Sequence, residues 1–431
     1  MKKSRYNILS NFGDKHLLYN TVTGATVLLN DEYYSQYVSN DKKADIANYF
    51  SNMEKGGFYV ADEIDEFARL TNIMQDSMKS NRILSLTIAP TLSCNFRCPY
   101  CYETGRKYNT MTPSIVSDVI HFIHERIEAT QLIDGKHHVS ISWYGGEPLL
   151  QPKIIEQITR AIELHKNVDL HSSIVTNGYY LTSDMTKYLK ELNVVAAQVT
   201  VDGPPDIHNE RRCLPNHSDT FYRILSNISE ACEFLNISIR INIDRKNMER
   251  VDELLDYFDQ YNLRGKVNVY IAAVDDINNI GNCYHSGCLN SRDFSEYESA
   301  FYMRNLNRGY TFVGLPRFNG QLCGAVASNS FVIDPLGDLY KCWDEIGIKE
   351  KSSGNVKTGF DTPNMKKWTC YNFTYYSECK ECAFLPVCLG GCPYHNISSN
   401  IMNCATVRYN YVSLAQILNS RRTEAQNVYN D

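Results

Sequence analysis

The chain has 431 residues, of which 43% are hydrophobic, and its formal net charge is −6. The length favours two or three domains with a large core, and the slight negative charge argues against a general binder of nucleic acids or other polyanions. The chain opens without the apolar run of a signal peptide and contains no segment long enough to cross a bilayer, so we expect a cytoplasmic protein that does not enter a membrane.

Residues 1–80 carry the patterns of a small mixed domain. Strand patterns at 16–19 and 25–30 flank a turn at Thr23 and Gly24, and they predict a β-hairpin. A short wing-like strand is expected at 58–60. Helical patterns are expected at 32–38, 43–53 and 62–78.

Residues 82–275 alternate between strand and helix patterns. Strands are predicted at 83–89, 139–144, 173–176, 194–201, 237–243 and 267–274. Helical patterns such as 154–165 and 251–260 lie between them. Repeated βα units predict an α/β fold with parallel strands and outer helices, and six units make a partial (β/α)6 TIM-like barrel. Barrels of this kind keep their active site at the carboxyl ends of the strands.

The alternation fades after residue 275. Residues 276–319 are expected to form a connector with one helix near 294–305. Residues 320–431 form the third predicted domain. Up to about residue 405 it consists of short, turn-rich segments and is rich in cysteine. A C-terminal helix is expected at 405–426.

The 15 cysteines indicate metal sites, because a reducing cytoplasm disfavours disulfides. Cys94, Cys98 and Cys101 follow the first barrel strand, with three and two residues between them. Three thiolates on one loop can bind three irons of a [4Fe–4S] cluster and leave the fourth iron open. The spacing alone also fits a zinc site with a fourth ligand elsewhere. The place of the loop at the carboxyl end of a barrel strand favours the iron–sulfur interpretation.

This motif, with Tyr100 before the last cysteine, resembles that of the radical S-adenosylmethionine (SAM) superfamily. Three further motifs of the family's peptide-modifying branch match at the ends of the next strands: Gly145-Gly146-Glu147-Pro148, Thr176-Asn177-Gly178 and Asp202-Gly203-Pro204. The resemblance implies that the cluster reduces bound SAM and that the resulting 5′-deoxyadenosyl radical removes a hydrogen atom from the substrate. It also implies that SAM contacts Tyr100, Gly145, Gly146, Glu147, Ser173, Asn177 and Arg212. A solvated surface pair is the alternative for Arg211 and Arg212, and Asp202 is expected to shape its loop.

The later cysteines resemble a SPASM domain, which binds two auxiliary [4Fe–4S] clusters and would bring the total to three. The resemblance implies that one auxiliary cluster is held by Cys379, Cys382, Cys388 and Cys404. It implies that the other is held by Cys323, Cys342 and Cys392, with Cys370 or an open iron in the fourth place. Two zinc sites are the alternative. Cys213, Cys232, Cys283 and Cys288 match no motif and are expected to be buried small residues or free thiols.

Two enzyme classes fit these motifs. One is a maturase of ribosomally made peptides that forms thioether or carbon–carbon crosslinks, and the other is an anaerobic sulfatase maturase that forms formylglycine. In the sulfatase maturases an aspartate follows the cysteine that matches Cys342 and acts as a base. Here Trp343 takes that place, and Asp344, the candidate catalytic residue, comes one residue later. This difference favours the peptide maturase, while an epimerase or a non-catalytic iron–sulfur scaffold also fits parts of the pattern.

Residues 1–80 support the same interpretation, because they resemble a winged-helix-like peptide-recognition domain that binds a leader by strand addition. A cap on the barrel is the alternative, and the excess of acidic over basic side chains argues against DNA. The expected partners are a precursor peptide with a leader and a one-electron donor of the flavodoxin or ferredoxin type.

Overall fold

The structure is a computed structural model. It describes residues 1–39, 47–103, 105–275, 287–310, 314–398 and 402–428, and their side chains apart from those of 47–50 and 421–428. Cys283 and part of the predicted connector lie outside the described residues. Within the described part of the chain, no helix is both long and apolar enough to span a membrane.

A nine-stranded sheet with the order β11-β10-β9-β8-β7-β6-β12-β13-β14 forms the centre of the molecule. Six of its strands run parallel: β6 (Ile83–Ile88), β7 (His137–Trp143), β8 (Val168–Thr176), β9 (Val194–Thr200), β10 (Asn236–Ile243) and β11 (Val267–Ala273). The predicted α/β fold with six consecutive parallel strands is confirmed. Strand β8 begins five residues earlier than predicted, at Val168. Its first four residues alternate between apolar and polar side chains, but none of them is buried, so this half has no core face.

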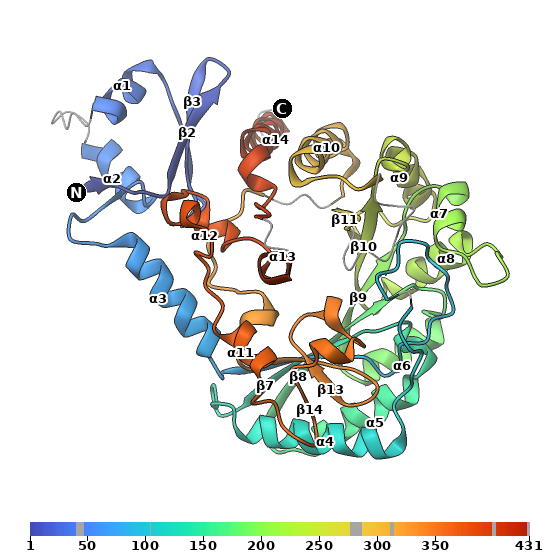
Figure 1. Cartoon of the computed structure of the whole chain (residues 1–431). Helices are drawn as coiled ribbons and strands as arrows, with labels where there is room; N and C mark the ends of the chain where they lie inside the picture. Colours follow the sequence, from blue (N-terminus) through green and yellow to red (C-terminus); the bar gives the residue numbers. More distant parts are fainter. Residues whose placement is uncertain (40–46, 104, 276–286, 311–313, 399–401, 429–431) are drawn as a thin grey trace.

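Helices cover the outer side of these strands, and the strands follow an open arc (Figure 1). The helices are α4 (Pro113–Glu128), α5 (Pro152–Glu163), α6 (Ser183–Glu191), α7 (Pro205–Arg211), α8 (Phe221–Ala231) and α9 (Val251–Gln260). Helix α5 illustrates why they form. Pro152 opens it, and Ile154, Ile155, Ile158 and Ile162 are buried on one face at helical spacing.

Three short strands of the cysteine-rich segment extend the barrel sheet. Strand β12 (Ser330–Ile333) pairs in parallel with β6, and β13 (Asp338–Tyr340) and β14 (Gly354–Asn355) continue the sheet in antiparallel fashion. The sequence did not predict these strands, since segments of two to four residues carry too little periodicity. The pairing joins the barrel and the C-terminal segment in one sheet.

The N-terminal segment contains a three-stranded antiparallel sheet of β2 (Asn7–Phe12), β3 (Lys15–Asn20) and β4 (Thr26–Leu29). The predicted hairpin corresponds to β3 and β4, whereas β2 was not predicted, because apolar and polar residues do not alternate along its sequence. Strands β1 (Lys2–Lys3) and β5 (Tyr59–Val60) form a second small sheet. The helices are α1 (Asp31–Ser39), α2 (Ala47–Lys55) and α3 (Glu66–Lys79).

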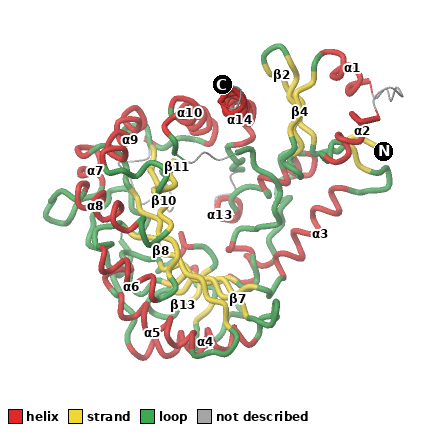
Figure 2. Tube along the Cα trace, turned by 180° about the vertical axis from the view of Figure 1, so that it is seen from behind, coloured by secondary structure: helices red, strands yellow, loops and turns green. Residues whose placement is uncertain are grey.

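The remaining helices lie C-terminal to the barrel strands: α10 (Ser291–Arg304), α11 (Pro363–Thr369), α12 (Leu385–Cys388), α13 (Pro393–Ser398) and α14 (Val407–Val428). Helix α13 lies between the N-terminal segment and the barrel strands, both in Figure 1 and from the opposite side in Figure 2. The N-terminal segment is fixed to this region. Thr21 Oγ1 donates to the carbonyl of Ala383 at 2.6 Å, and Arg5 Nη2 donates to that of Lys380 at 2.6 Å.

Candidate active site

The three cysteines of the first motif lie on the loop after β6, where each thiol is partly buried. Cys94, Cys98 and Cys101 are electrostatic neighbours of one another. Burial raises the pKa of Cys94 and of Cys101 to about 12 and also raises the pKa of Cys98. Because iron binds thiolates, occupation of this loop must release protons.

Two glycines bring the end of β7 against the cysteine loop. A β-carbon on Gly146 would lie 2.4 Å from the carbonyl oxygen of Ser93, and one on Gly145 would lie 2.4 Å from that of Thr91. Gly145 also has a φ of +109°, which side chains disfavour. Any larger residue would therefore push the cysteine loop away from β7.

Glu147 is fully buried and ties the ends of β7 and β8 together. Its Oε1 accepts hydrogen bonds from Thr176 Oγ1 at 2.8 Å and from the Leu149 amide at 3.0 Å. Its Oε2 accepts one from the Asn177 amide at 2.8 Å. Burial raises the pKa of Glu147, and these hydrogen bonds oppose the increase. A carboxylate has about four acceptor positions, so one is left over for a ligand.

Amide groups lie beside the first cysteine. Asn177 Nδ2 donates to Asn95 Oδ1 at 2.8 Å and lies 3.9 Å from Cys94 Sγ. Asn95 Nδ2 is buried and has no hydrogen-bond partner among the described residues. Ser173, the other predicted contact on β8, is partly exposed and alternates with the buried Ile174. Donors close to sulfur stabilise a thiolate that is bound to iron.

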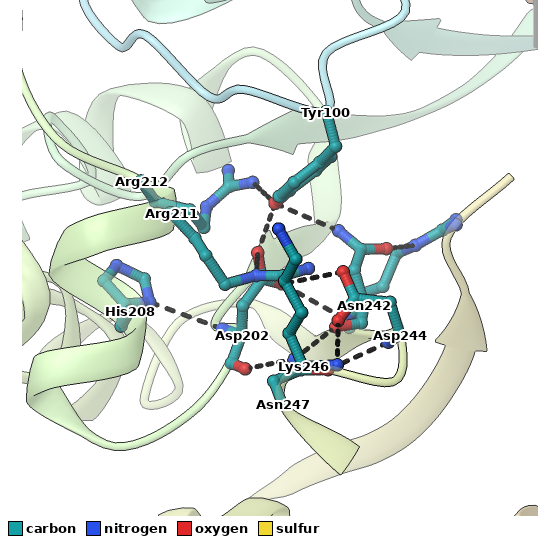
Figure 3. Close-up of polar contacts among 10 residues, drawn as sticks. Tyr100, Asp202, His208, Arg211, Arg212, Asn242, Asp244, Lys246 and Asn247 are labelled. Atoms are coloured by element: carbon teal, nitrogen blue, oxygen red, sulfur yellow. Dashed lines mark hydrogen bonds and ion pairs between the residues drawn. The ribbon is translucent and has the colours of Figure 1, made fainter. Parts of the chain in front are cut away.

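Tyr100 is the centre of a buried polar network (Figure 3). Its hydroxyl donates to the carboxylate of Asp202 and accepts a hydrogen bond from Arg212 Nη1 at 2.6 Å. Asn242 Nδ2 lies 3.4 Å from the same oxygen. Burial raises the pKa of Tyr100 well above its ordinary value, so the hydroxyl keeps its proton. The network ties the cysteine loop to the ends of β9 and β10.

Arg211 and Arg212 are buried, with exposed fractions of 3% and 8%. Arg211 Nη1 pairs with Asp244 Oδ2 at 2.7 Å, and its Nε lies 3.5 Å from Asp202 Oδ2. The alternative of a solvated arginine pair is therefore wrong. Arg212 is an electrostatic neighbour of Cys98, and its charge counteracts the rise in the pKa of this thiol that burial causes.

Asp202 holds this part of the site together. Besides Tyr100 and Arg211, it accepts a hydrogen bond from the Asn242 amide at 3.1 Å, and its own amide donates to His208 Nδ1 at 3.3 Å. Burial lowers the pKa of His208 well below its ordinary value, so this imidazole is neutral. These contacts fit the interpretation that Asp202 shapes the loop.

The later cysteines form two groups in space. Cys379, Cys382, Cys388 and Cys404 are electrostatic neighbours of one another. Cys323 has both Cys342 and Cys392 as electrostatic neighbours. The chain thus brings together the two crossed sets that the resemblance implies. Cys370 is exposed at the end of α11, and Cys213 is buried.

A tight turn separates the two crossed sets. Gly390 lies between Cys388 and Cys392 with a φ of +80°, and a β-carbon on it would lie 2.2 Å from the carbonyl oxygen of Phe373. Asn396 Nδ2 also donates to the Gly390 carbonyl at 2.7 Å. This turn allows two cysteines four residues apart to face different groups.

Tyr102 and Arg106, which the sequence analysis did not single out, help to connect the two cysteine regions. The hydroxyls of Tyr102 and Tyr144 form a hydrogen bond, and the ring of Tyr144 stacks on that of Trp343 with centroids 5.7 Å apart. Arg106 Nη2 donates to the Asp344 carbonyl at 2.7 Å. Their signal in the sequence is adjacency to the motifs, since Tyr102 follows Cys101 and Tyr144 precedes Gly145.

Asp344, the candidate catalytic residue, lies on a 3₁₀ turn, η8 (Trp343–Glu345), and is 8% exposed. Asp275 and His395 are electrostatic neighbours of Asp344. His395 Nε2 lies 2.8 Å from Asp275 Oδ2, and this hydrogen bond raises the pKa of His395. Side chains that can exchange a proton therefore border the three-cysteine group of Cys323, Cys342 and Cys392.

Comparison with known proteins identifies the barrel. Residues 88–258 match the family model of the Radical SAM superfamily, so the chain carries a radical SAM domain and the predicted resemblance is confirmed. Such a domain implies a [4Fe–4S] cluster and SAM. The residues fit both groups: three clustered thiols, an amide donor without a partner beside Cys94, and two glycines where a ligand must approach the backbone.

The described residues contain no group of three or more His, Cys, Asp or Glu side chains arranged around a single metal ion. A four-iron cluster has a different requirement, because each thiolate binds a different iron.

Relatives of this chain include a sulfatase-maturating enzyme and a cyclopropyl synthase. A cysteine-type anaerobic sulfatase-maturating enzyme of Clostridium perfringens is 27% identical over 72% of this chain and 88% of its own length. The radical SAM cyclopropyl synthase TigE of Paramaledivibacter caminithermalis is 24% identical over 85% of this chain and 80% of its own length.

Two solved structures share the fold. The anSMEcpe structure with bound AdoMet and the Kp18Cys peptide has a TM-score of 0.63 at 20% identity and covers 78% of this chain and 99% of its own. Streptococcus suis SuiB bound to the precursor peptide SuiA has a TM-score of 0.55 at 14% identity and covers 94% of this chain and 98% of its own. The second similarity therefore includes the N-terminal segment.

Proposed function

We propose that this chain is a radical SAM maturase that installs an intramolecular thioether or carbon–carbon crosslink in a ribosomally made precursor peptide. The observation that carries the proposal is the contact between the two cysteine regions, where Tyr144 beside the SAM motif stacks on Trp343 beside Cys342. A substrate held there would lie between a source of radicals and an electron acceptor. The similarity to SuiB, whose structure contains the precursor peptide SuiA, supports a peptide substrate.

When bound, SAM and its cluster supply a 5′-deoxyadenosyl radical. Cys94, Cys98 and Cys101 would hold that cluster. Gly145 and Gly146 would admit SAM to the backbone, while Tyr100, Glu147, Ser173, Asn177 and Arg212 would orient it. The guanidinium of Arg212 suits a carboxylate and lies close to Cys98.

Crosslinking removes two hydrogens from the peptide. One leaves as a hydrogen atom, and the other leaves as a proton together with one electron. The two later cysteine groups would hold auxiliary [4Fe–4S] clusters that accept this electron, and Asp344 or the His395–Asp275 pair would accept the proton. A flavodoxin- or ferredoxin-type donor would supply the electron that cleaves SAM.

SAM cleavage by the anaerobically reconstituted and reduced chain tests the first part of this proposal. We expect 5′-deoxyadenosine as a product, and we expect Cys98→Ala to abolish its formation, because one iron then loses its ligand. Cys232→Ala is the matched control, since this thiol belongs to neither region and bonds to the Ser229 carbonyl at 3.2 Å. If the unmodified chain cleaved no SAM, an iron–sulfur scaffold would be the better interpretation.

Mass spectrometry of the precursor peptide tests the second part. We expect a product lighter by two hydrogens that does not fragment between the two linked residues. An unchanged mass with an inverted stereocentre would identify an epimerase and contradict the crosslink.

Sulfatase maturation is the second candidate, because the sulfatase-maturating relatives align over 72% of this chain. A formylglycine product carries an aldehyde, which reacts with hydrazide reagents, whereas a crosslink does not. Incubation with a cysteine- or serine-containing sulfatase peptide and a hydrazide probe therefore separates the two functions.

We further propose that the N-terminal segment binds the leader. Strand β4 is an edge of its sheet, and an edge strand can accept a peptide as a further strand. A pocket of about 90 Å³ opens beside it, between β4 and α14. Its lining is mainly apolar and includes Leu17, Val27, Leu28, Leu315 and Leu418. An apolar side chain of the leader would anchor in this pocket.

Leu418→Glu should weaken binding of the leader about tenfold, because it puts a charge into the apolar pocket. Fluorescence anisotropy with a labelled leader, from a short precursor encoded beside the gene, would measure this. Leu164→Glu is the control, since Leu164 is 85% exposed on the outside of the barrel. Equal affinities of the two variants would argue against leader binding at this pocket.

A further inference from the structure

The group of Cys323, Cys342 and Cys392 provides three of the four ligands that close a four-iron cluster. An acidic side chain lies directly beside this group. Asp344 is on the η8 turn that follows Cys342, and its Oδ2 lies 3.4 Å from Cys342 Sγ. A carboxylate oxygen is therefore in contact with one of the three thiols.

Asp344 is an electrostatic neighbour that all three thiols share. Its carboxylate is among the main electrostatic neighbours of Cys323, of Cys342 and of Cys392. These cysteines come from separate parts of the chain, and Asp344 is near all three, with the direct contact to Cys342. Asp344 is also 8% exposed, which means that it faces this group and not the solvent.

Cys370, the fourth ligand predicted from the resemblance, occupies a different position. It is exposed at the end of α11, where it is an electrostatic neighbour of Lys366. In the described part of the chain it is not among the main electrostatic neighbours of the three thiols.

The main chain of Asp344 is fixed from the barrel side. Arg106, itself 8% exposed, donates to the Asp344 carbonyl at 2.7 Å. The Glu345 amide also donates to the Cys342 carbonyl at 3.1 Å and closes the turn. The loop after the first three cysteines therefore holds the turn that directs this carboxylate toward the later ones.

We propose that Asp344 is the fourth ligand of the auxiliary cluster, binding through a carboxylate oxygen beside Cys323, Cys342 and Cys392. Iron accepts carboxylate as well as thiolate ligands. This proposal rests on the proposed function, which provides an auxiliary cluster at these cysteines. It makes the cluster a closed one, which can accept an electron without binding the substrate to iron. Of the two proton acceptors named above, it leaves that role to the His395–Asp275 pair.

The test uses the full chain with Cys94, Cys98 and Cys101 replaced by alanine, so that only auxiliary clusters contribute to the spectra. In this background we would compare the parent with Asp344→Ala, Asp344→Cys, Cys370→Ala and the control Glu345→Gln. Glu345 is the adjacent buried acid, and its main electrostatic neighbours are lysines and Asp344 and not the three thiols. The probe is isotopically labelled cyanide, whose binding to an open iron is seen as a hyperfine coupling in the spectrum of the reduced cluster.

We expect cyanide coupling in Asp344→Ala and none in the parent, in Cys370→Ala or in Glu345→Gln. Asp344→Cys should keep the cluster closed and lower its reduction potential, because a thiolate donates more charge to iron than a carboxylate does. This variant remains informative if Asp344→Ala loses the cluster. Coupling in Cys370→Ala alone, or in the parent itself, would overturn the proposal in favour of Cys370 or of an open iron.

Iron analysis of the parent separates the two levels of the argument. Two auxiliary clusters correspond to about eight irons per chain. If the parent held about four irons and Cys323→Ala did not change this amount, the proposed auxiliary cluster itself would be refuted. If the parent held about eight irons and Asp344→Ala and Asp344→Cys left cyanide binding and potential unchanged, only the assignment of Asp344 would be refuted.

Discussion

Gly146→Ala should lower the rate of SAM cleavage at least about 100-fold, because it displaces the cysteine loop. The added methyl group would lie 2.4 Å from the Ser93 carbonyl oxygen and 2.5 Å from that of Leu92. Both atoms belong to the main chain directly before Cys94, so no side-chain rotation can relieve the contact. The formation of 5′-deoxyadenosine by the reduced enzyme would measure the effect.

Gly314→Ala is the matched control for this prediction. A β-carbon on Gly314 would meet only the end of the Leu418 side chain, at 4.0 Å, which is an ordinary contact. We expect this variant to cleave SAM at the parent rate. If Gly146→Ala also kept the parent rate and its full iron content, the close approach of β7 to the cysteine loop would not matter for the reaction.

Asp202→Ala should lower the free energy of unfolding by about 3–5 kcal/mol, because it removes one partner from a buried ion network. Asp202 is fully buried and accepts hydrogen bonds from Tyr100 and from the Asn242 amide, and Arg211 lies next to it. These donors would remain in the interior with one acceptor fewer. Urea unfolding, followed by tryptophan fluorescence, would measure the loss.

The control for the network is another aspartate of the same segment. Asp206 pairs with Arg250 at 2.5 Å, but both side chains are largely exposed. Surface pairs of this kind contribute about 0–1 kcal/mol, so Asp206→Ala should have little effect on unfolding. Equal losses in the two variants would show that burial of the Tyr100–Asp202 network does not determine its contribution.

Local patterns in the sequence predicted much of the barrel. All six parallel strands overlap their predicted positions, because buried apolar residues alternate with more exposed ones along them, and this alternation is visible without tertiary contacts. The same holds for α9, whose bounds, Val251–Gln260, match the prediction. Strand β12 was missed, because its four residues become a strand only by pairing with β6.

The sequence by itself determined the composition of the site: three cysteines on one loop, glycines at the next strand end, and a second field of cysteines whose spacing resembles a known pattern. Only the tertiary structure decided which polar groups are buried together. It placed Arg211 and Arg212 in the interior, directed Glu147 into hydrogen bonds of the chain itself, and brought Asp344 near the distant Cys323 and Cys392. These outcomes depend on contacts between residues tens to hundreds of positions apart, which local periodicity and spacing do not encode.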